Sequence, residues 1–309
     1  MSLINKTIVI AALARNCEKY LADNLTRIEE LRECFAHSYV VILENDSKDA
    51  TKQILSFYKN KTSEVKLISK DYHGEYPIKK YPKSNYQEKS CNRIARMAFL
   101  RNQILSCVKT IAFDYLITID IDIYSFSVKG VCDAIANAPS NWGGLFANGR
   151  IFFKSGHSTI HPLPIVYDIY ACFVNTLDFN KLSRLYLNDT YLLIRQYLIG
   201  QLSDKHDYLP VVSAYGGLGI YKKECLTNEY QVKTPLTWKN SNASLCEHVL
   251  FNKNICDNGY QCYLVKNLEV CYSIIDKGGF KGFLVKNYPL LYAIASHCAK
   301  ILKRIQSKS

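Results

Sequence analysis

Long hydrophobic runs are absent from this 309-residue chain. The most continuous apolar segment, residues 8–14, has seven residues, whereas a membrane-spanning helix needs about 20. The N-terminal residues also lack the basic stretch, apolar core and small-residue cleavage site of a secretion signal. Because 48% of the residues are hydrophobic, the chain can still bury a sizeable core. We therefore expect a folded protein of the cytoplasm.

Closely spaced cysteine pairs are absent too. None of the twelve cysteines stands in a Cys-x-x-Cys pair, so their spacing fits no standard zinc module and no disulfide framework. Two phosphate-binding motifs are also missing, namely Gly-x-x-x-x-Gly-Lys and a Gly-x-Gly-x-x-Gly after the first predicted strand. These absences argue against zinc proteins, P-loop hydrolases and dinucleotide-dependent oxidoreductases.

Arginine is scarce, although the chain is basic. Lys and Arg number 39 against 27 Asp and Glu, which gives a net charge of +12 and suits an anionic partner. Only ten of the basic residues are arginine, the side chain that nucleic-acid readers favour for bidentate contacts. We therefore expect a phosphate-bearing small molecule or a membrane surface as the anionic partner, and no nucleic acid.

The C-terminal residues hold half of this charge. Residues 276–309 contain seven basic residues and one acidic residue, a balance of +6. Seven apolar residues of the same segment share one helical face: Leu290, Leu291, Ile294, Cys298, Ile301, Leu302 and Ile305. We predict a basic amphipathic extension over residues 273–309 that either touches an anionic membrane or packs on the core.

The first half of the chain alternates between strand and helix patterns. Apolar, β-branched runs typical of buried parallel strands occupy residues 7–14, 39–43, 65–68 and 115–119. Helical spacing covers residues 16–35, where Asn16 is a suitable N-cap, a second helix before residue 65, and residues 92–108. Residues 70–91 are polar and without period, which predicts a long functional loop. The pattern predicts an α/β fold with its ligand site at the carboxyl ends of the strands.

The second half is less regular. We predict strands at residues 142–147, 209–215 and 261–265, and helices at residues 183–202 and 244–256. Three glycines within residues 213–221 indicate that the backbone passes close to another group there. No repeat of 20 to 50 residues is visible.

Two aspartates follow the strand at residues 115–119. Residues at i and i+2 of a strand point to the same side, so the carboxylates of Asp120 and Asp122 can converge on one hard cation. Such a cation would hold a diphosphate and neutralise it as a leaving group. The alternative is a structural surface turn, but the position directly after five buried residues favours the metal site.

Polar residues also follow the strand at residues 39–43. Glu44, Asn45 and Asp46 can accept hydrogen bonds from a ribose or a base, while Asp46 or Ser47 would also cap the next helix. Arg93, Arg96 and Arg101 lie within one predicted helix, which suits a diphosphate partner. A solvated helix face paired with acidic residues is the alternative for these arginines.

Glu247 and His248 begin a late predicted helix. A carboxylate there can act as a general base or bind the acceptor, and a neutral imidazole can be a third metal ligand. Helix capping and surface exposure are the simpler interpretation of such a pair.

Taken in order, these motifs resemble glycosyltransferases of the GT-A fold. The matching segments are Ala-Arg-Asn at 14–16, Glu-Asn-Asp-Ser at 44–47, the arginine helix at 93–102 and Asp-Ile-Asp at 120–122. Further along lie Trp142, Phe-Ala-Asn-Gly at 146–149, Tyr167-Asp168, Tyr215-Gly-Gly and Cys-Glu-His at 246–248. The set is similar to the fungal capsule-associated α-1,3-mannosyltransferases and their bacterial relatives, over about residues 7–272.

This resemblance implies a fold and a site. The fold would be a mixed, mostly parallel sheet flanked by helices, in one domain over residues 1–272. Its donor half would be residues 1–125 and its acceptor half residues 126–272. The implied donor-binding residues are Arg15, Glu44, Asn45, Asp46, Arg93, Arg96, Arg101 and Asp120. The implied acceptor-binding residues are Asp168, Gly216, Gly217 and Glu247, and the metal would be Mn²⁺ or Mg²⁺ on Asp120, Asp122 and His248.

The implied activity is transfer of a hexose such as mannose. The donor would be a GDP- or UDP-linked sugar, and the acceptor a glycan or lipid-linked glycan of surface polysaccharide synthesis. Asp122 and Glu247 are the candidate catalytic residues: Glu247 would be the base of an inverting enzyme, whereas the retention suggested by the mannosyltransferases would give it a positioning role. The protein would work in the cytoplasm, peripherally on the inner face of the membrane. The alternatives are a nucleotidyltransferase acting on sugar phosphates and a non-catalytic protein that binds polyanions or membranes.

Overall fold

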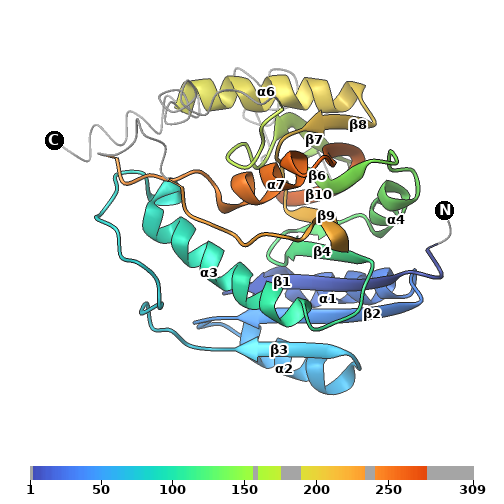
Figure 1. The fold of residues 1–309 in the computed structure, drawn as a ribbon, viewed down its shortest axis with the longest axis vertical. Coiled ribbons are helices and arrows are strands. Elements are labelled where there is room, and N and C mark those ends of the chain that lie inside the picture. The colour runs from blue at the N-terminus through green and yellow to red at the C-terminus, as the bar shows by residue number, and fades with distance from the viewer. Residues whose placement is uncertain (1–2, 156–158, 175–188, 234–240, 277–309) are drawn as a thin grey trace.

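A computed structural model describes residues 3–155, 159–174, 189–233 and 241–276 of the chain (Figure 1). In this part of the chain, ten strands form one sheet in the order β3-β2-β1-β4-β9-β6-β10-β5, with β7 paired to β6 and β8 paired to β10. The strands are β1 (Thr7–Ala14), β2 (His37–Glu44), β3 (Val65–Ser69), β4 (Tyr115–Asp120), β5 (Ser125–Phe126), β6 (Trp142–Ser155), β7 (Thr159–Val166), β8 (Tyr208–Val211), β9 (Leu218–Lys222) and β10 (Gln261–Asp276).

Strand direction makes the sheet mixed but mostly parallel. β1, β2, β3 and β4 pair in parallel, and β9 then runs antiparallel between β4 and β6. Since β10 pairs in parallel with β6, six of the ten strands share one direction. The β4–β9 pair joins the predicted donor half to the predicted acceptor half in one continuous sheet.

Helices cover both faces of this sheet (Figure 1). Their bounds are α1 (Glu18–Arg32), α2 (Thr51–Lys61), α3 (Cys91–Val108), α4 (Val128–Ala136), α6 (Asp189–Lys205) and α7 (Glu247–Asp257), with short 3-10 turns at Gln87–Lys89 and Lys223–Cys225. The arrangement confirms the predicted α/β class, with a mixed, mostly parallel sheet flanked by helices.

The side-chain alternation of β1 shows why the sheet has two cores. Ile8 and Ile10 point to the face covered by α1, α2 and α4, whereas Val9 and Ala11 point to the face covered by α3, α6 and α7. All four are at most 1% exposed. A fully buried isoleucine or valine contributes about 1.5–3 kcal/mol relative to an exposed one, so a strand buried on both faces needs the continuous apolar run that β1 has.

Several predicted boundaries are wrong in detail. Asn16 does not cap α1: it has a φ of +50°, and its side-chain oxygen accepts a hydrogen bond from the Lys48 backbone N–H at 2.8 Å. α2 begins at Thr51, so neither Asp46 nor Ser47 caps it. The contacts of Asn16 instead join the two turns that follow β1 and β2.

The second half shows larger differences from the predictions. The strand predicted at 209–215 ends at Val211, and the helix predicted at 244–256 begins at Glu247. β10 runs to Asp276, so residues 273–276 belong to the sheet rather than to an extension. The predicted segments 183–188 and 277–309 lie outside the described residues. α4, β5, β7 and β9 were not predicted.

No helix in the described part of the chain combines the length and the apolar character that a membrane-crossing helix needs.

Candidate active site

Three strand ends bring the predicted polar residues to one edge of the sheet. In the parallel registers, Ala14 lies opposite Glu44, and Leu13 lies opposite Asp120. Arg15 follows the last residue of β1, Glu44 ends β2 and Asp120 ends β4. The sequence pattern predicted this convergence, because carboxyl ends of parallel strands meet at one edge.

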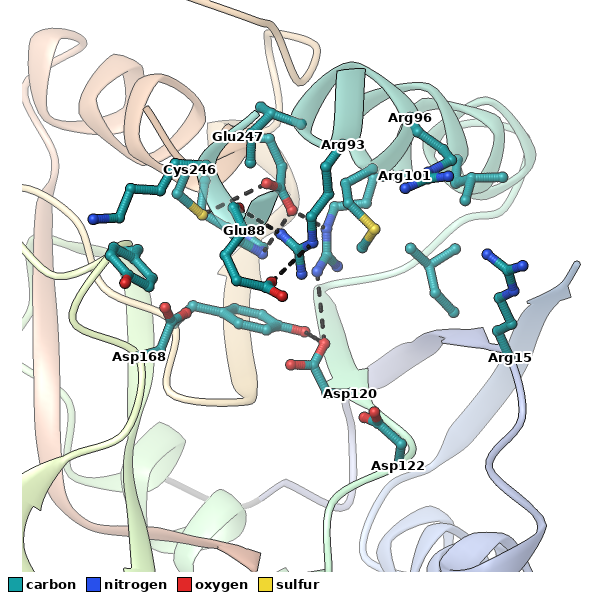
Figure 2. A pocket seen from close by; sticks show the side chains of 18 of the residues that line it. Arg15, Glu88, Arg93, Arg96, Arg101, Asp120, Asp122, Asp168, Cys246 and Glu247 are labelled. Atoms are coloured by element: carbon teal, nitrogen blue, oxygen red, sulfur yellow. Dashed lines mark hydrogen bonds and ion pairs between the residues drawn. The ribbon is translucent and has the colours of Figure 1, made fainter. Parts of the chain in front are cut away.

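A cavity of about 630 Å³ opens at this edge (Figure 2). Ten of the predicted site residues line it: Arg15, Asn45, Arg93, Arg96, Arg101, Asp120, Asp122, Asp168, Glu247 and His248. Four others, Glu44, Asp46, Gly216 and Gly217, are not among its lining residues. The helix α3 and the start of α7 supply one wall, and the turns after β1 and β4 supply another.

The pKa values of the Asp120 and Asp122 carboxyl groups are both raised. Burial raises the pKa of Asp120 to about 7; the Arg101 charge opposes this rise, while the charges of Asp122 and Asp168 add to it. Enclosure in the cavity also raises the pKa of Asp122. A cation between the two carboxylates would relieve the repulsion that the Asp122 charge exerts on Asp120.

This environment suits a divalent cation on two ligands rather than three. Asp120 and Asp122 offer the oxygen donors that Mn²⁺ and Mg²⁺ prefer, and Mg²⁺ commonly uses one or two carboxylates together with substrate phosphates. Among the described residues, however, no three His, Cys, Asp or Glu side chains are grouped to hold a metal ion. The predicted set of Asp120, Asp122 and His248 is therefore not a ready-made three-ligand site, and metal binding stays a prediction.

His248 lies within a stack of aromatic side chains. It is 1% exposed, and its ring packs on Tyr215 with the ring centres 3.9 Å apart. Neither ring nitrogen has a hydrogen-bond partner among the described residues, and burial lowers its pKa well below the usual histidine value, with Arg101 adding to the effect. The imidazole is therefore neutral, and it supports Tyr215, whose hydroxyl donates to Asp120 at 3.1 Å.

Arg101 connects the two groups of carboxylates. Its guanidinium Nε donates to Glu247 Oε1 at 3.1 Å, and Nη2 lies 3.6 Å from Asp120 Oδ1 (Figure 2). The side chain is 9% exposed, and it also lies 5.1 Å from the centre of the Tyr215 ring. The donors of Arg101 are thus directed at protein carboxylates, which separates it from the other two arginines predicted to bind a diphosphate.

The remaining cavity arginines mark two ends of the cavity. Figure 2 places Arg15 and Arg96 on one side and Asp168 and Cys246 on the other, with Arg93 between them. Arg96 lies over the ring of Tyr76 at 5.5 Å, whereas Arg93 pairs with Glu88 at 3.3 Å and contributes to the field at Asp168. Arg96 and Arg93 therefore serve different parts of the cavity although they share one helix.

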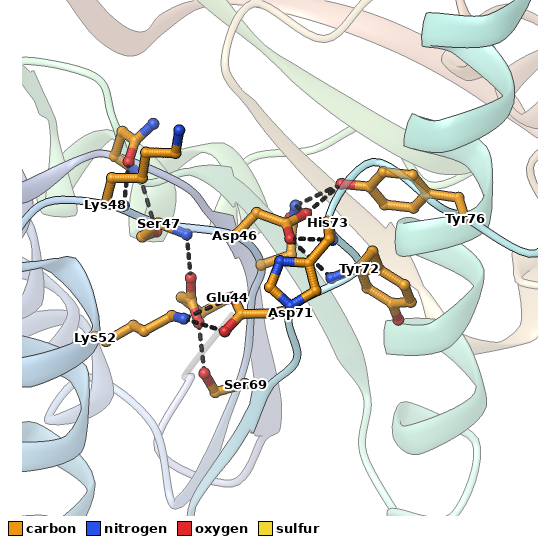
Figure 3. A network of polar contacts seen from close by, with 12 residues as sticks. Glu44, Asp46, Ser47, Lys48, Lys52, Ser69, Asp71, Tyr72, His73 and Tyr76 are labelled. Carbon is orange, nitrogen blue, oxygen red and sulfur yellow. Dashed lines mark hydrogen bonds and ion pairs between the residues drawn. The ribbon is translucent and has the colours of Figure 1, made fainter.

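Asp46 organises the turn that carries Tyr76 (Figure 3). Its Oδ1 accepts hydrogen bonds from the backbone N–H groups of Tyr72 and His73 at 2.7 and 2.8 Å, and its Oδ2 accepts from the Tyr76 hydroxyl at 2.8 Å. Burial alone would raise the pKa of Asp46, but the hydrogen bonds outweigh it and lower the pKa to about 2. The carboxylate is thus occupied by its own chain, which gives it a support role beside the cavity.

Glu44 is likewise occupied within the protein. It is fully buried, and it accepts hydrogen bonds from the Ser47 backbone N–H at 2.9 Å and from the Ser69 hydroxyl. The prediction that Glu44 contacts a nucleotide-sugar donor therefore gains no support from this geometry. Asn45, the residue between the two acids, does line the cavity and donates to the Tyr76 hydroxyl at 2.8 Å.

The two glycines predicted on the acceptor side pack against the sheet instead. Gly216 has a φ of +63°, and a Cβ at this position would lie 2.1 Å from the carbonyl oxygen of Ala147 in β6. The carbonyl of Gly217 accepts a hydrogen bond from the Asp120 backbone N–H at 2.9 Å. The close backbone approach that the glycines indicated is therefore to β6 and β4, and it fixes the end of β4.

Two tyrosines of the cavity were not revealed by the sequence. Tyr76 and Tyr272 line the cavity, and Tyr272 stacks on Tyr167 of the Tyr167-Asp168 motif with ring centres 3.4 Å apart. Tyr76 lies in the aperiodic loop and Tyr272 within a long strand, so neither position carried a signal of its own. The chain has 23 tyrosines, which makes composition uninformative about any single one.

Comparison with curated proteins found no match. Among solved structures, the mannosyltransferase PcManGT of Pyrobaculum calidifontis in complex with GDP-Man and Mn²⁺ aligns with 97% of this chain and 65% of its own, at 12% identity and a TM-score of 0.48. TarS of S. aureus (residues 1–349) aligns over 93% and 64%, at 14% identity and a TM-score of 0.43. The chain thus spans less than two thirds of the length of these two structures.

A third solved structure is the glucosyl-3-phosphoglycerate synthase of Mycobacterium tuberculosis in complex with Mn²⁺, UDP and phosphoglyceric acid. It aligns over 88% of this chain and 68% of its own, at 12% identity and a TM-score of 0.40.

The comparison with protein families gives the most specific result. Residues 7–128 match the family described as Cryptococcal mannosyltransferase 1. This range contains β1 to β4, the arginine helix α3 and both aspartates of the cavity. The match confirms the predicted resemblance to the fungal mannosyltransferases over this range, and it supports the prediction of a glycosyltransferase.

Proposed function

We propose that the chain is a cation-dependent glycosyltransferase that moves a hexose, with mannose the first candidate, from a nucleotide-diphosphate sugar. The observation that carries this proposal is the cavity at the ends of β1 and β4, where Asp120 and Asp122 face Arg15, Arg93 and Arg96. The family match over residues 7–128 supports the same activity.

The charges of the cavity suit this combination of ligands. Its lining has five basic residues (Arg15, Lys89, Arg93, Arg96 and Arg101) and five acidic residues (Glu88, Asp120, Asp122, Asp168 and Glu247), so the formal charges cancel. A divalent cation and the two negative charges of a sugar diphosphate would also cancel one another. The lining can therefore accept both ligands together without a large charge imbalance.

The nucleotide would lie at the end with Arg15, Asn45, Tyr76 and Arg96. The two guanidinium groups can donate to phosphate oxygens, and Asn45 and Tyr76 offer polar groups for the ribose or base. The Asp46 contacts keep Tyr76 in place for this role. We propose either GDP or UDP as the nucleotide, because this set of groups suits both.

Asp120 and Asp122 would hold the cation beside the diphosphate. A bound Mn²⁺ or Mg²⁺ supplies charge that stabilises the departing nucleoside diphosphate. Arg101 and Tyr215 fix the orientation of the Asp120 carboxylate, and the Gly217 carbonyl fixes its backbone.

The acceptor would enter from the end with Asp168, Tyr170 and Glu247. Arg101 holds the carboxylate of Glu247, which is 3% exposed, in one orientation. In an inverting reaction Glu247 would take the proton of the acceptor hydroxyl; in a retaining one it would orient the acceptor. We propose a glycan or lipid-linked glycan as the acceptor, with surface polysaccharide synthesis on the cytoplasmic side of the membrane as its setting.

Product analysis tests this proposal. The chain is incubated with GDP- and UDP-sugars and Mn²⁺ or Mg²⁺, and the products are separated by anion-exchange chromatography. We expect slow release of nucleoside diphosphate and free sugar, because water replaces a missing acceptor. Release of pyrophosphate from a nucleoside triphosphate and a sugar phosphate would instead identify a nucleotidyltransferase, and no reaction with any donor would contradict the proposal.

A further inference from the structure

The helix α6 has apolar side chains on two opposite faces. Leu192 and Ile199 are at most 5% exposed and belong to the core under the sheet. Ile194, Leu198 and Leu202 point away from it and are 47%, 54% and 39% exposed. These three residues, spaced four apart, form one stripe along the helix, which we call the α6 stripe. A helix that is apolar on both faces is usually covered on both.

The α6 stripe contains half of the exposed large hydrophobic side chains among the described residues. Among the described residues, six large hydrophobic side chains are exposed, and three of these are the stripe. The other three, Ile4, Phe57 and Tyr86, lie in separate parts of the chain. Single exposed apolar residues need no explanation, whereas a contiguous row of them marks an interaction surface.

The inner face of α6 is hydrogen-bonded to the backbone segment that carries Tyr167 and Asp168 of the cavity wall. The Gln196 side-chain amide donates to the carbonyl oxygens of Val166 and Tyr167 at 3.0 and 3.4 Å, and the Arg195 guanidinium donates to the carbonyl of Cys172. Residues 167–170 form the end of the cavity assigned to the acceptor. Whatever covers the α6 stripe is therefore separated from this end of the cavity by a single helix.

A strongly basic segment leaves the described structure beside α6. β10 ends at Asp276, which pairs with Lys154 of β6, and this end of β6 pairs with β7, on which α6 packs. The 33 residues that follow, 277–309, contain seven basic residues and no acidic one. More than half of the net charge of +12 thus follows the end of β10, in the part of the sheet on which α6 packs.

We propose that the α6 stripe is a docking surface for an anionic lipid bilayer. The three aliphatic side chains would enter the interfacial region, and the basic residues that follow β10 would add attraction to anionic headgroups. This placement turns the Asp168 end of the cavity toward the membrane. If the proposed glycosyltransferase function holds, the acceptor is then a lipid-linked glycan presented from the bilayer.

Vesicle co-sedimentation of the full chain tests this surface. The probes are vesicles of phosphatidylcholine alone and vesicles with about one third phosphatidylglycerol, which carry the negative surface potential. We expect binding to the anionic vesicles and a loss of roughly fivefold or more in the partition coefficient for Leu198→Ser and for Ile194→Ser, because each removes apolar area from the interface. Phe57→Ser is the matched control: Phe57 is 61% exposed on α2, at the opposite end of the molecule (Figure 1), and its substitution should leave binding unchanged.

Three results would overturn the proposal. The first is equal vesicle binding by wild type, Leu198→Ser and Phe57→Ser. The second is a dimer in solution that Leu198→Ser converts to a monomer without any vesicle binding, which would make the stripe an interface between copies of the chain. The third is stronger vesicle binding after truncation at Asp276, which would show that the chain's own C-terminal residues cover the stripe.

The same variants separate this proposal from the proposed function. Leu198→Ser should keep nucleotide-sugar binding, and Asp120→Asn should keep vesicle binding. If vesicle binding fails while donor cleavage persists, only the docking surface is wrong; if donor cleavage fails while vesicle binding persists, only the enzymatic assignment is wrong.

Discussion

At the residue scale, Arg101 is the side chain on which the geometry of the cavity most depends. It lies between Asp120 and Glu247, and its ion pair with Glu247 is buried, with both side chains at most 9% exposed, so little solvent is available to replace Arg101 beside Glu247. Sequence spacing placed Arg101 with Arg93 and Arg96 on one helix, but spacing could not show that its donors are taken by protein carboxylates. Only the contact with α7, far along the chain, distinguishes the three arginines.

Replacing Arg101 by glutamine should therefore destabilise the protein. The buried carboxylate of Glu247 would lose its cationic partner, and breaking a buried ion pair in this way costs about 3 kcal/mol or more. Arg96→Gln is the matched change on the same helix, and it should alter stability by less than about 0.5 kcal/mol while weakening donor binding about tenfold. Urea unfolding and donor titration measure the two effects. Equal stability of both variants would contradict the role assigned to Arg101.

Asp168 should make stability depend on pH. Burial raises its pKa to about 6, and the Glu247 charge adds to the rise. A carboxyl with a raised folded-state pKa favours the folded state at low pH and loses that contribution as the pH rises through about 6. Asp168→Asn removes this loss, so the variant should melt about 2–4 °C above wild type at pH 8, with the difference disappearing near pH 4. Calorimetric melting at both pH values tests this; a difference that is constant with pH would argue against it.

At the element scale, the strands that carry the site were the best predicted. β1 and β4 are buried on both faces, so their sequences are continuous apolar runs, and the polar residues that follow them stand out. β7 was missed because its sequence, TIHPLPIV, contains two prolines. Within the described part of the chain this strand pairs only with β6, and edge strands tolerate proline. α4 was missed although Ser127 caps it, because nine residues show too few helical repeats.

The turn after β8 gives a prediction of its own. A Cβ on Gly216 would clash with the Ala147 carbonyl at 2.1 Å, and its φ of +63° also disfavours other residues. Gly216→Ala should cost about 2 kcal/mol or more, and it should also weaken donor binding, since this turn supports Asp120. Gly74→Ala is the matched control, because Gly74 has a φ of +84° but nothing within 4 Å of its Cβ position, leaving about 1 kcal/mol of backbone strain. Chemical denaturation should rank the two variants in that order, and the reverse order would be inconsistent with the packing described.

At the scale of the whole molecule, the fold class followed from the alternation of patterns in the first half of the chain. The second half could not be traced in the same way, because β6, β9 and β10 pair across large sequence separations. The site depends on those pairings: β9 holds β4, and α7 brings Glu247 to Arg101. Sequence reasoning therefore brought Arg15, Asn45 and Arg96 to the sheet edge where the cavity lies, whereas the internal contacts of Glu44, Asp46 and Gly216 became visible only in three dimensions.

The single central claim is that Asp120 and Asp122 bind a nucleotide-diphosphate sugar through a divalent cation. Isothermal titration of GDP- and UDP-sugars, with and without Mn²⁺ or Mg²⁺, tests it most directly. We predict that wild type binds one of these donors only when the cation is present, and that Asp120→Asn and Asp122→Asn each weaken binding at least about tenfold. Asp133→Asn, a change in a solvent-facing carboxylate of α4 paired with Lys129, should have no effect. Donor binding that is independent of the cation and unchanged in both cavity variants would contradict the claim.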